Sequence, residues 1–130
     1  MQAALRNVSF VAPTPIQAAT ITPGLAGRDV IGAAQTGTGK TAAFMIPIVE
    51  RLRALGEGGK PRGTAVVLAP TRELAEQIHE WARRLGPGLK TALVVGGVAY
   101  GPQYGALRAR PSIVIATPGR LVDHVERKTI

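Results

Sequence analysis

The residues best suited to chemistry form one glycine-rich run, Ala34-Gln35-Thr36-Gly37-Thr38-Gly39-Lys40-Thr41. Gly37 and Gly39 lack a Cβ, so the backbone there can take positive φ and approach a ligand closely. Successive N–H groups in such a loop form a nest for anions at the start of a helix. The Lys40 ammonium can reach the β- and γ-phosphates of a nucleotide, and the Thr41 hydroxyl can bind the Mg²⁺ ion that bridges them. The run therefore predicts a phosphate-binding loop, with Lys40 and Thr41 as its catalytic residues and Thr41 as the metal ligand.

The general pattern for such a loop is G-x-x-x-x-G-K-[ST], and this chain has Ala34 at its first position. A glycine-rich turn with a chance Lys-Thr pair is the alternative interpretation. The flanking sequence argues against chance, because an apolar, β-prone stretch at residues 30–33 precedes the loop. Residues 40–55 follow with apolar side chains at helical spacing, although Pro47 interrupts them. A strand before the loop and a helix after it are the context that the motif requires.

Other apolar runs and turn residues predict the elements that position this loop. We expect strands at residues 65–69, 91–95 and 112–116, the first of them buried. We expect helices at residues 14–24, 71–85 and 103–110, a last helix from residue 117, and a flexible loop at 56–63. In the helix at 71–85, Trp81 is expected in the core and His79 on the solvated surface. Strands alternating with helices predict an α/β fold with a parallel sheet flanked by helices.

Composition limits the functions that the chain can have. It has 130 residues, no cysteine, two distant histidines and a formal net charge of +8 at pH 7. The missing cysteines exclude a disulfide framework and fit a cytoplasmic protein, and two histidines do not suggest a zinc site. No apolar run reaches the length of a membrane span, so we expect no membrane partner. The positive charge favours a polyanionic partner, nucleic acid before a membrane surface, although a general enrichment in arginine is the alternative.

The first predicted helix has a clear start signal. Thr14 is a good N-cap, Pro15 suits the first helical position, and Gln17 falls at the third. Thr14 and Gln17 together match a capping box. By itself this pattern gives Gln17 a structural role.

Four blocks in this order resemble the first RecA-like domain of DEAD-box RNA helicases. Residues 10–17, F-V-A-P-T-P-I-Q, look like the Q motif of that family. Residues 34–41 look like its motif I, in which Ala is the usual first residue. Residues 70–75, P-T-R-E-L-A, look like motif Ia. The glycine pair at 96–97 and T-P-G-R at 117–120 look like the double-glycine element and motif Ib.

This resemblance implies an ATP site. In the family the Q-motif glutamine binds the adenine edge, and the motif's aromatic residue lies close to the base. A Gln amide offers an acceptor and two donors, which suits adenine. Gln17 would then select ATP over GTP, competing with or oriented by its capping role. The implied ATP and Mg²⁺ contacts are Phe10, Pro15, Gln17, Ala34, Gln35, Thr36, Gly37, Thr38, Gly39, Lys40 and Thr41.

The resemblance also implies an RNA-binding surface. The implied contacts to the RNA backbone are Pro70, Thr71, Arg72, Gly96, Gly97, Thr117, Pro118, Gly119 and Arg120. Turns from strand to helix expose N–H groups, hydroxyls and a guanidinium to phosphates. Helix N-capping is the alternative for Thr71 and Thr117, and a simple surface charge is the alternative for Arg72. Because phosphate contacts carry no sequence information, we expect sequence-independent binding.

The resemblance covers residues 1–130 as a partial helicase ATP-binding domain, a RecA-like P-loop fold with three α/β/α layers and a Q motif at residues 9–17. We expect the D-E-A-D and S-A-T blocks and the second RecA-like domain, which supplies an arginine finger, to be missing. In the family the strands ending in those two blocks lie between the phosphate-loop strand and the other three. Without them, the strand at 30–33 needs a new neighbour or the sheet has a gap.

Three interpretations of function follow. The first is the amino-terminal part of an ATP-dependent RNA helicase, whose parent couples ATP hydrolysis to RNA unwinding or ribonucleoprotein remodelling. The second is an inactive fragment that binds nucleotide or RNA. The third, another phosphate-loop enzyme such as a nucleotide kinase, leaves the blocks at 70–75 and 117–120 unexplained.

Overall fold

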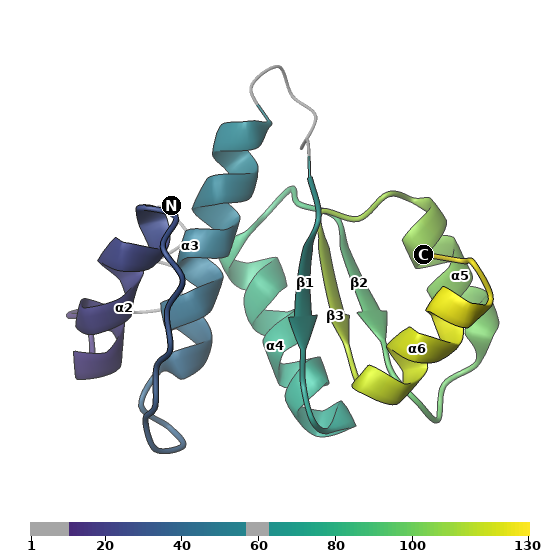
Figure 1. The fold of residues 1–130 in the computed structure, drawn as a ribbon, viewed down its shortest axis with the longest axis horizontal. Helices are drawn as coiled ribbons and strands as arrows, with labels where there is room; N and C mark the ends of the chain where they lie inside the picture. Colours follow the sequence, from purple (N-terminus) through teal and green to yellow (C-terminus); the bar gives the residue numbers. More distant parts are fainter. Residues whose placement is uncertain (1–10, 57–62) are drawn as a thin grey trace.

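The computed structural model describes residues 11–56 and 63–130. Its helices and strands follow one another along the chain as Figure 1 shows. They are α2 (Pro15–Leu25), α3 (Lys40–Leu55), β1 (Ala65–Leu68), α4 (Arg72–Leu85), β2 (Thr91–Val94), α5 (Tyr100–Arg108), β3 (Ile113–Ala116) and α6 (Pro118–Glu126). Most of the loop predicted at 56–63 lies outside the described residues.

The three strands form one parallel sheet in the order β1-β3-β2. Val114 in the central strand pairs with Val66 of β1 and with Ala92 of β2. Each strand lies within the range predicted for it. Because the strands are parallel, their carboxyl ends meet at one edge of the sheet, at the bottom of Figure 1. The phosphate loop, residues 34–41, lies at the bottom of the same view.

Helices cover both faces of this sheet, which confirms the predicted α/β/α layers. Side chains alternate along a strand, so β3 sends Ile113 and Ile115 to one face and Val114 to the other. Ile113 and Ile115 join a core with α3 and α4, through residues such as Met45 and Leu85. On the opposite face, Val114 and Ala116 pack with Leu107 of α5 and Leu121 of α6. All four residues of β3 are buried.

The predicted strand at residues 30–33 is wrong. These residues have no strand structure, and the sheet of the described residues has three strands. A strand needs a neighbour to pair its backbone N–H and C=O groups, and residues 30–33 pair with none of the three described strands. Ile31 is fully exposed despite its apolar side chain. Of the two outcomes that we expected, a new neighbour for this segment or a gap beside the sheet, the described residues show the gap.

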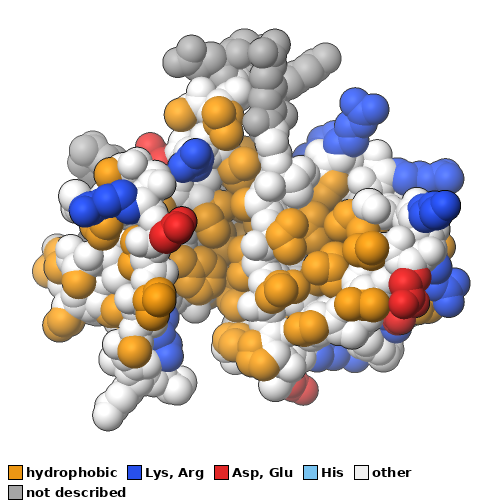
Figure 2. Space-filling view, in the orientation of Figure 1, with side chains coloured by type: hydrophobic (Ala, Val, Ile, Leu, Met, Phe, Trp, Pro, Cys, Tyr) orange, Lys and Arg blue, Asp and Glu red, His pale blue; other side chains and the backbone are white. Residues whose placement is uncertain are grey.

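The same gap explains why β1 is not the buried strand that its apolar sequence predicts. β1 is an edge strand, and its side chains alternate between half-buried and exposed. Val66 and Leu68 are 52% and 56% exposed. Figure 2 shows hydrophobic side chains gathered on this face of the molecule, over β1 and toward α3.

Two predictions for α4 also need correction. His79 is not a free surface residue, because it is half-buried and its Nε2 atom lies 2.8 Å from the Thr91 hydroxyl. Trp81 is only partly buried, packed against the core of α3 and α4 rather than within it. The predicted bounds of α4 hold, with Gly86 as its C-cap.

Candidate functional site

The phosphate loop has the backbone geometry that its sequence predicts. Gly37 and Gly39 have φ of 83° and 86°, in the left-handed region that favours glycine. Gly39 is the N-cap of α3, so Lys40 and Thr41 are the first two residues of that helix. The loop is open to solvent around Gly37. An anion at this position meets the free N–H groups and the positive end of the helix dipole.

Lys40 lies at the mouth of this loop. Its ammonium donates to the carbonyl oxygen of Ala34 across 2.5 Å and is exposed. The Thr38 hydroxyl donates to the carbonyl oxygen of Gln35 across 2.6 Å, which tightens the same turn. The Lys40 ammonium thus spans the loop from its last residues to its first. A phosphate seated in the loop would compete with Ala34 for this cation.

Gln17 links α2 to the phosphate loop. Its side-chain oxygen accepts from the Thr14 N–H across 3.1 Å, as part of the predicted capping box. Its side-chain nitrogen donates to the carbonyl oxygen of Gly39 across 3.2 Å, and the residue is only 2% exposed. The Thr14 hydroxyl also donates to the carbonyl oxygen of Thr38, across 2.8 Å. The Gln17 amide keeps one further N–H and one lone pair for a ligand.

Two further residues, Pro15 and Phe10, are predicted to lie near the adenine of ATP. Pro15 is the first residue of α2 and is exposed. Phe10 lies outside the described residues.

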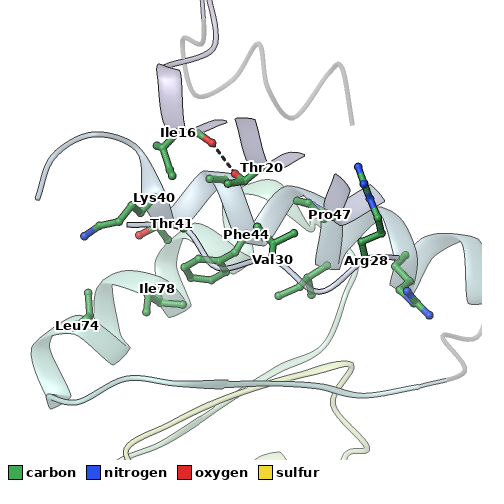
Figure 3. Close-up of a pocket in the computed structure, with 15 residues that line it drawn as sticks. Ile16, Thr20, Arg28, Val30, Lys40, Thr41, Phe44, Pro47, Leu74 and Ile78 are labelled. Carbon is green, nitrogen blue, oxygen red and sulfur yellow. Dashed lines mark hydrogen bonds between the residues drawn. The ribbon is translucent and has the colours of Figure 1, made fainter. Parts of the chain in front are cut away.

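A cavity of about 520 Å³ lies beside this loop, where the expected strand at 30–33 does not pair with the sheet. Figure 3 shows its mostly apolar lining, which comes from α2, α3, α4 and the segment before the loop. Phe44 and Ile78 point into it, while Lys40 and Thr41 lie at one end. Pro15 and Gln17 are not part of its lining. Ile16, which also belongs to the Q-motif block, does line it, so the cavity adjoins both the Q motif and the phosphate loop.

The turn after β1 carries Thr71 and Arg72. The Thr71 hydroxyl accepts from the N–H of Leu74 across 3.2 Å, so it caps α4 as the alternative interpretation proposed. Arg72 is exposed and pairs with Glu76, with 2.8 Å between Nε and Oε1. This hydrogen bond raises the pKa of Arg72. The rest of the guanidinium remains open to solvent.

The turn after β2 meets this arginine. Gly97 has φ of 74°, and a Cβ at that position would lie 3.2 Å from Nη1 of Arg72. Gly97 is exposed, as is Gly96 before it. The structure thus brings together two predicted RNA contacts that are 25 positions apart in the sequence, Arg72 and Gly97.

The turn after β3 lies between the other two, because β3 is the central strand. Thr117 is the N-cap of α6, but its hydroxyl makes no capping hydrogen bond. Pro118 and Gly119 are exposed. Arg120 is held within the protein, since its side chain is 12% exposed and its Nη1 donates to the carbonyl oxygen of Val98 across 2.8 Å. The Arg120 guanidinium also lies 4.2 Å from the ring centre of Tyr100.

The sequence analysis missed two buried polar residues behind these turns, Gln103 and His124. His124 lies in α6, where Val122 and Val125 are exposed while His124 is not. The i, i+3 spacing of Leu121 and His124 was the available signal, because it puts both on one helix face. Burial, and then the nearby charge of Arg120, lower the pKa of His124. Burial and Arg83 likewise lower the pKa of His79.

Two negative findings concern the described residues only. No group of three or more His, Cys, Asp or Glu side chains in residues 11–56 and 63–130 could hold a metal ion. Across the same residues, each helix is too short or too polar to cross a bilayer.

Comparison with known proteins gives matches over nearly the whole chain. A family model described as DEAD/DEAH box helicase matches residues 14–130. The ATP-dependent rRNA helicase RRP3 of Candida glabrata is 54% identical over 125 residues, which are 95% of this chain and 24% of that protein. The DEAD-box ATP-dependent RNA helicase CshA of Bacillus subtilis is 47% identical over 129 residues, 98% of this chain and 25% of that protein. The chain thus spans about a quarter of the length of these relatives.

Two solved structures are similar in fold. A hypothetical ATP-dependent RNA helicase from Sulfolobus tokodaii has a TM-score of 0.87 and 39% identity, covering 99% of this chain and 36% of that one. The DEAD-box helicase Mss116, bound to ssRNA and UDP-BeF, has a TM-score of 0.84 and 39% identity, covering 95% of this chain and 26% of that one. These likenesses confirm the predicted RecA-like fold class.

Proposed function

Because the chain belongs to the DEAD/DEAH box helicase family, we propose that it is the ATP- and RNA-binding part of an ATP-dependent RNA helicase. The whole protein then couples ATP hydrolysis to RNA duplex unwinding or ribonucleoprotein remodelling. One observation carries the proposal. The phosphate loop is tied to Gln17 through Gly39, and the three turns with the predicted RNA contacts follow the carboxyl ends of the parallel strands. Ligands bind at that edge in open α/β sheets.

Residues 34–41 are the proposed site for the nucleotide phosphates. The fit rests on the open loop at Gly37 and on the exposed Lys40 ammonium, which has only Ala34 as its partner in the described residues. Lys40 would bind the β- and γ-phosphates, and Thr41 would bind Mg²⁺ through its hydroxyl. When bound, Mg²⁺ neutralises the charge that develops on the phosphates. Gln17, through its free N–H and lone pair, would bind the adenine edge.

The RNA backbone is the proposed ligand of the turns after β1, β2 and β3. Arg72 and the N–H groups around Gly97 form an exposed anion-binding position, and the formal net charge of +8 favours a polyanion. Mss116, which is similar in fold, is bound to ssRNA in its solved structure, and this supports RNA as the partner class. The capping bond of Thr71 leaves its hydroxyl hydrogen free to donate to a phosphate. Phosphate contacts of this kind hold RNA without reading its sequence.

A second candidate function concerns the 130 residues alone. Residues 11–56 and 63–130 hold no cluster of acids and histidines fit for a metal, so the polypeptide offers Mg²⁺ few protein ligands besides Thr41. As a separate polypeptide it would then bind nucleotide and RNA without catalysing hydrolysis.

A cytoplasmic location remains a prediction from the absence of cysteine.

The test of the proposed function is phosphate release by the full-length protein, measured with ATP, Mg²⁺ and increasing single-stranded RNA. We expect turnover that rises with RNA and is much slower with GTP. Equal turnover with and without RNA would contradict the assignment of an RNA-dependent ATPase. Equal turnover with GTP would instead contradict the role given to Gln17.

A further inference from the structure

We propose that Gln103 and His124 form a positioning pair, which fixes the turn at residues 96–98 relative to the turn at residues 117–120 so that both fit one RNA backbone. The inference rests on the proposed function, because it assumes that these two turns bind RNA. Neither residue touches the ligand under this proposal. Gln103 hydrogen-bonds to the backbone of the turn at residues 96–98, and His124 acts through Gln103.

Gln103 holds the turn at residues 96–98 from both sides. It lies in α5, is 3% exposed, and its side-chain nitrogen donates to the carbonyl oxygens of Val95 at 3.0 Å and Val98 at 3.4 Å. These two carbonyls flank the glycine pair. Gly96 and Gly97 have no side chains with which to fix the turn, and Gly97 has positive φ. The Gln103 amide therefore supplies the contacts that set the shape of this turn.

His124 orients that amide. Because both N–H groups of Gln103 face carbonyls, its oxygen must accept, and Nε2 of His124 donates to it across 3.1 Å. His124 is completely buried, and its Nδ1 lies 2.7 Å from the Thr129 hydroxyl. Donation from Nε2 to the Gln103 oxygen leaves Nδ1 of a neutral ring as an acceptor for the one Thr129 hydroxyl proton, which the His124 carbonyl oxygen also approaches, 3.0 Å from the same hydroxyl. The lowered pKa of His124 agrees with a neutral ring.

The same turn is held from α6 by a second side chain. Arg120 donates to the carbonyl oxygen of Val98, the atom that Gln103 also approaches. Its guanidinium stacks on Tyr100, whose hydroxyl donates to Asp123 across 2.9 Å. The backbone N–H of Thr117 donates to the carbonyl oxygen of Val94, across 3.0 Å. Side chains from α5 and α6 therefore converge on the carbonyl oxygen of Val98, in the turn at residues 96–98.

A buried polar pair constrains the local geometry in a way that apolar side chains of the same volume do not. A buried amide and imidazole are stabilising only if every donor and acceptor is satisfied, and an apolar pair of similar volume would avoid that demand. In the described residues no buried side-chain nitrogen or oxygen lacks a partner. A satisfied polar network has one geometry, whereas apolar packing tolerates several. This property suits two turns that must match the fixed spacing of RNA phosphates.

The first test needs no mutation of the pair. Long-range ¹H–¹⁵N correlation spectra of the chain at about pH 7.5 report the tautomer of each histidine. The chain has two histidines, so the variant His79→Gln assigns the signals. We expect His124 as the neutral tautomer protonated on Nε2. Protonation on Nδ1 would overturn the proposal, because the Gln103 amide would then have to turn its oxygen toward Val95 and Val98.

The second test compares RNA and ATP affinity in Gln103→Leu, a substitution of similar size that removes the hydrogen bonds. We expect binding of a fluorescent uridine oligonucleotide to weaken by about tenfold, because the buried Val95 carbonyl loses its side-chain donor and the Val98 carbonyl keeps only Arg120. We expect ATP affinity to stay that of the wild type. The salt slope of RNA binding should also stay unchanged, since no cation is removed. His79→Gln, at the half-buried histidine that pairs with Thr91, is the control and should change neither affinity.

The possible outcomes distinguish a failure of the positioning pair from a failure of the proposed RNA-binding function. RNA affinity unchanged in Gln103→Leu, with Arg72→Gln still weakening it, would overturn the positioning pair alone. A wild-type chain that does not bind RNA would overturn the proposed function and this inference together. Equal loss of ATP and RNA affinity in Gln103→Leu would show a general folding defect and count against a positioning role. If Gln103→Leu does not fold, His124→Asn and the tautomer measurement still decide the question.

Discussion

The side-chain nitrogen of Gln17 donates to the backbone carbonyl of Gly39 across 3.2 Å and so joins α2 to the phosphate loop. Gly39 is the residue at which the loop becomes helix α3. A Cβ on Gly39 would collide with the Gln17 amide, so the glycine is required for this contact as well as for its positive φ. Any ligand that moves the amide would therefore also move the phosphate loop.

We predict that Gln17→Ala weakens ATP binding and narrows the preference for ATP over GTP. The amide that would bind adenine is lost, together with its bonds to Thr14 and Gly39. Loss of the capping box alone would lower the free energy of unfolding by about 0.5–2 kcal/mol. Paired ATP and GTP titrations with thermal melts measure both effects. Gln77→Ala, at an exposed position on α4, is the control. An unchanged nucleotide preference with a lower melting temperature would leave Gln17 with a purely structural role.

We predict that Arg72→Gln weakens RNA binding and reduces the salt slope by about one, because one phosphate contact by a cation is lost. Arg84→Gln is a matched control. Arg84 pairs with Glu80 on the same helix as Arg72 pairs with Glu76, and both pairs are exposed. Fluorescence anisotropy between about 50 and 200 mM salt measures the slope. Equal effects of the two substitutions would show that Arg72 contributes only general charge.

We predict that the chain loses stability as the pH falls through about 6.5, the ordinary pKa of histidine. Burial lowers the pKa of both His79 and His124, so the folded chain binds protons less readily than the unfolded chain. The free energy of unfolding is then fully retained above this pH and falls below it. Urea titrations at several pH values measure the change, and His79→Gln should reduce it. Stability that rises as the pH falls through this window would contradict the assignment.

We predict that the 130-residue polypeptide does not hydrolyse ATP measurably, with or without RNA. Glu73 is the acid in the first turn of α4, after β1, and it is exposed. No acid occurs in the turns after β2 and β3, at residues 95–99 and 117–120. Losing one electrostatic element of a phosphoryl-transfer site costs about 10²–10³ in rate. Phosphate release with Lys40→Ala as the blank is the measurement. RNA-stimulated release above the blank would mean that another residue of the chain performs the role of the expected acids.

The sequence predicted the elements whose signals are local. α3 begins at Lys40 and ends at Leu55 as the apolar spacing and Gly39 indicate, and the capping box at Thr14 is present. The turns at 70–72, 96–97 and 117–120 follow the expected strands. The phosphate loop instead follows the segment at 30–33, which is not a strand.

The errors arise where a residue depends on distant neighbours. Ile31 and Val66 have strand-forming side chains, but whether they are buried depends on strands beside them, which local pattern cannot supply. His124 is polar and lies in a helix whose Val122 and Val125 are exposed. It can be buried because Gln103 and Thr129 are hydrogen-bond partners for its two ring nitrogens. The spacing of Leu121 and His124 places His124 on the inner face of the helix, but its partner Gln103 lies 21 positions away and local pattern cannot identify it.

The central claim is that residues 34–41 bind the phosphates of ATP through Lys40. It is tested most directly by titrating ATP and Mg²⁺ into the 130-residue chain and into Lys40→Ala. Lys90→Ala is the matched control, because Lys90 is also exposed and also donates to a backbone carbonyl, that of Ala109 across 3.3 Å. We expect the wild type and Lys90→Ala to bind ATP equally, and Lys40→Ala to bind at least about tenfold more weakly, since a charged hydrogen bond contributes about 1.5–3 kcal/mol. Equal ATP affinity in all three chains would contradict the account.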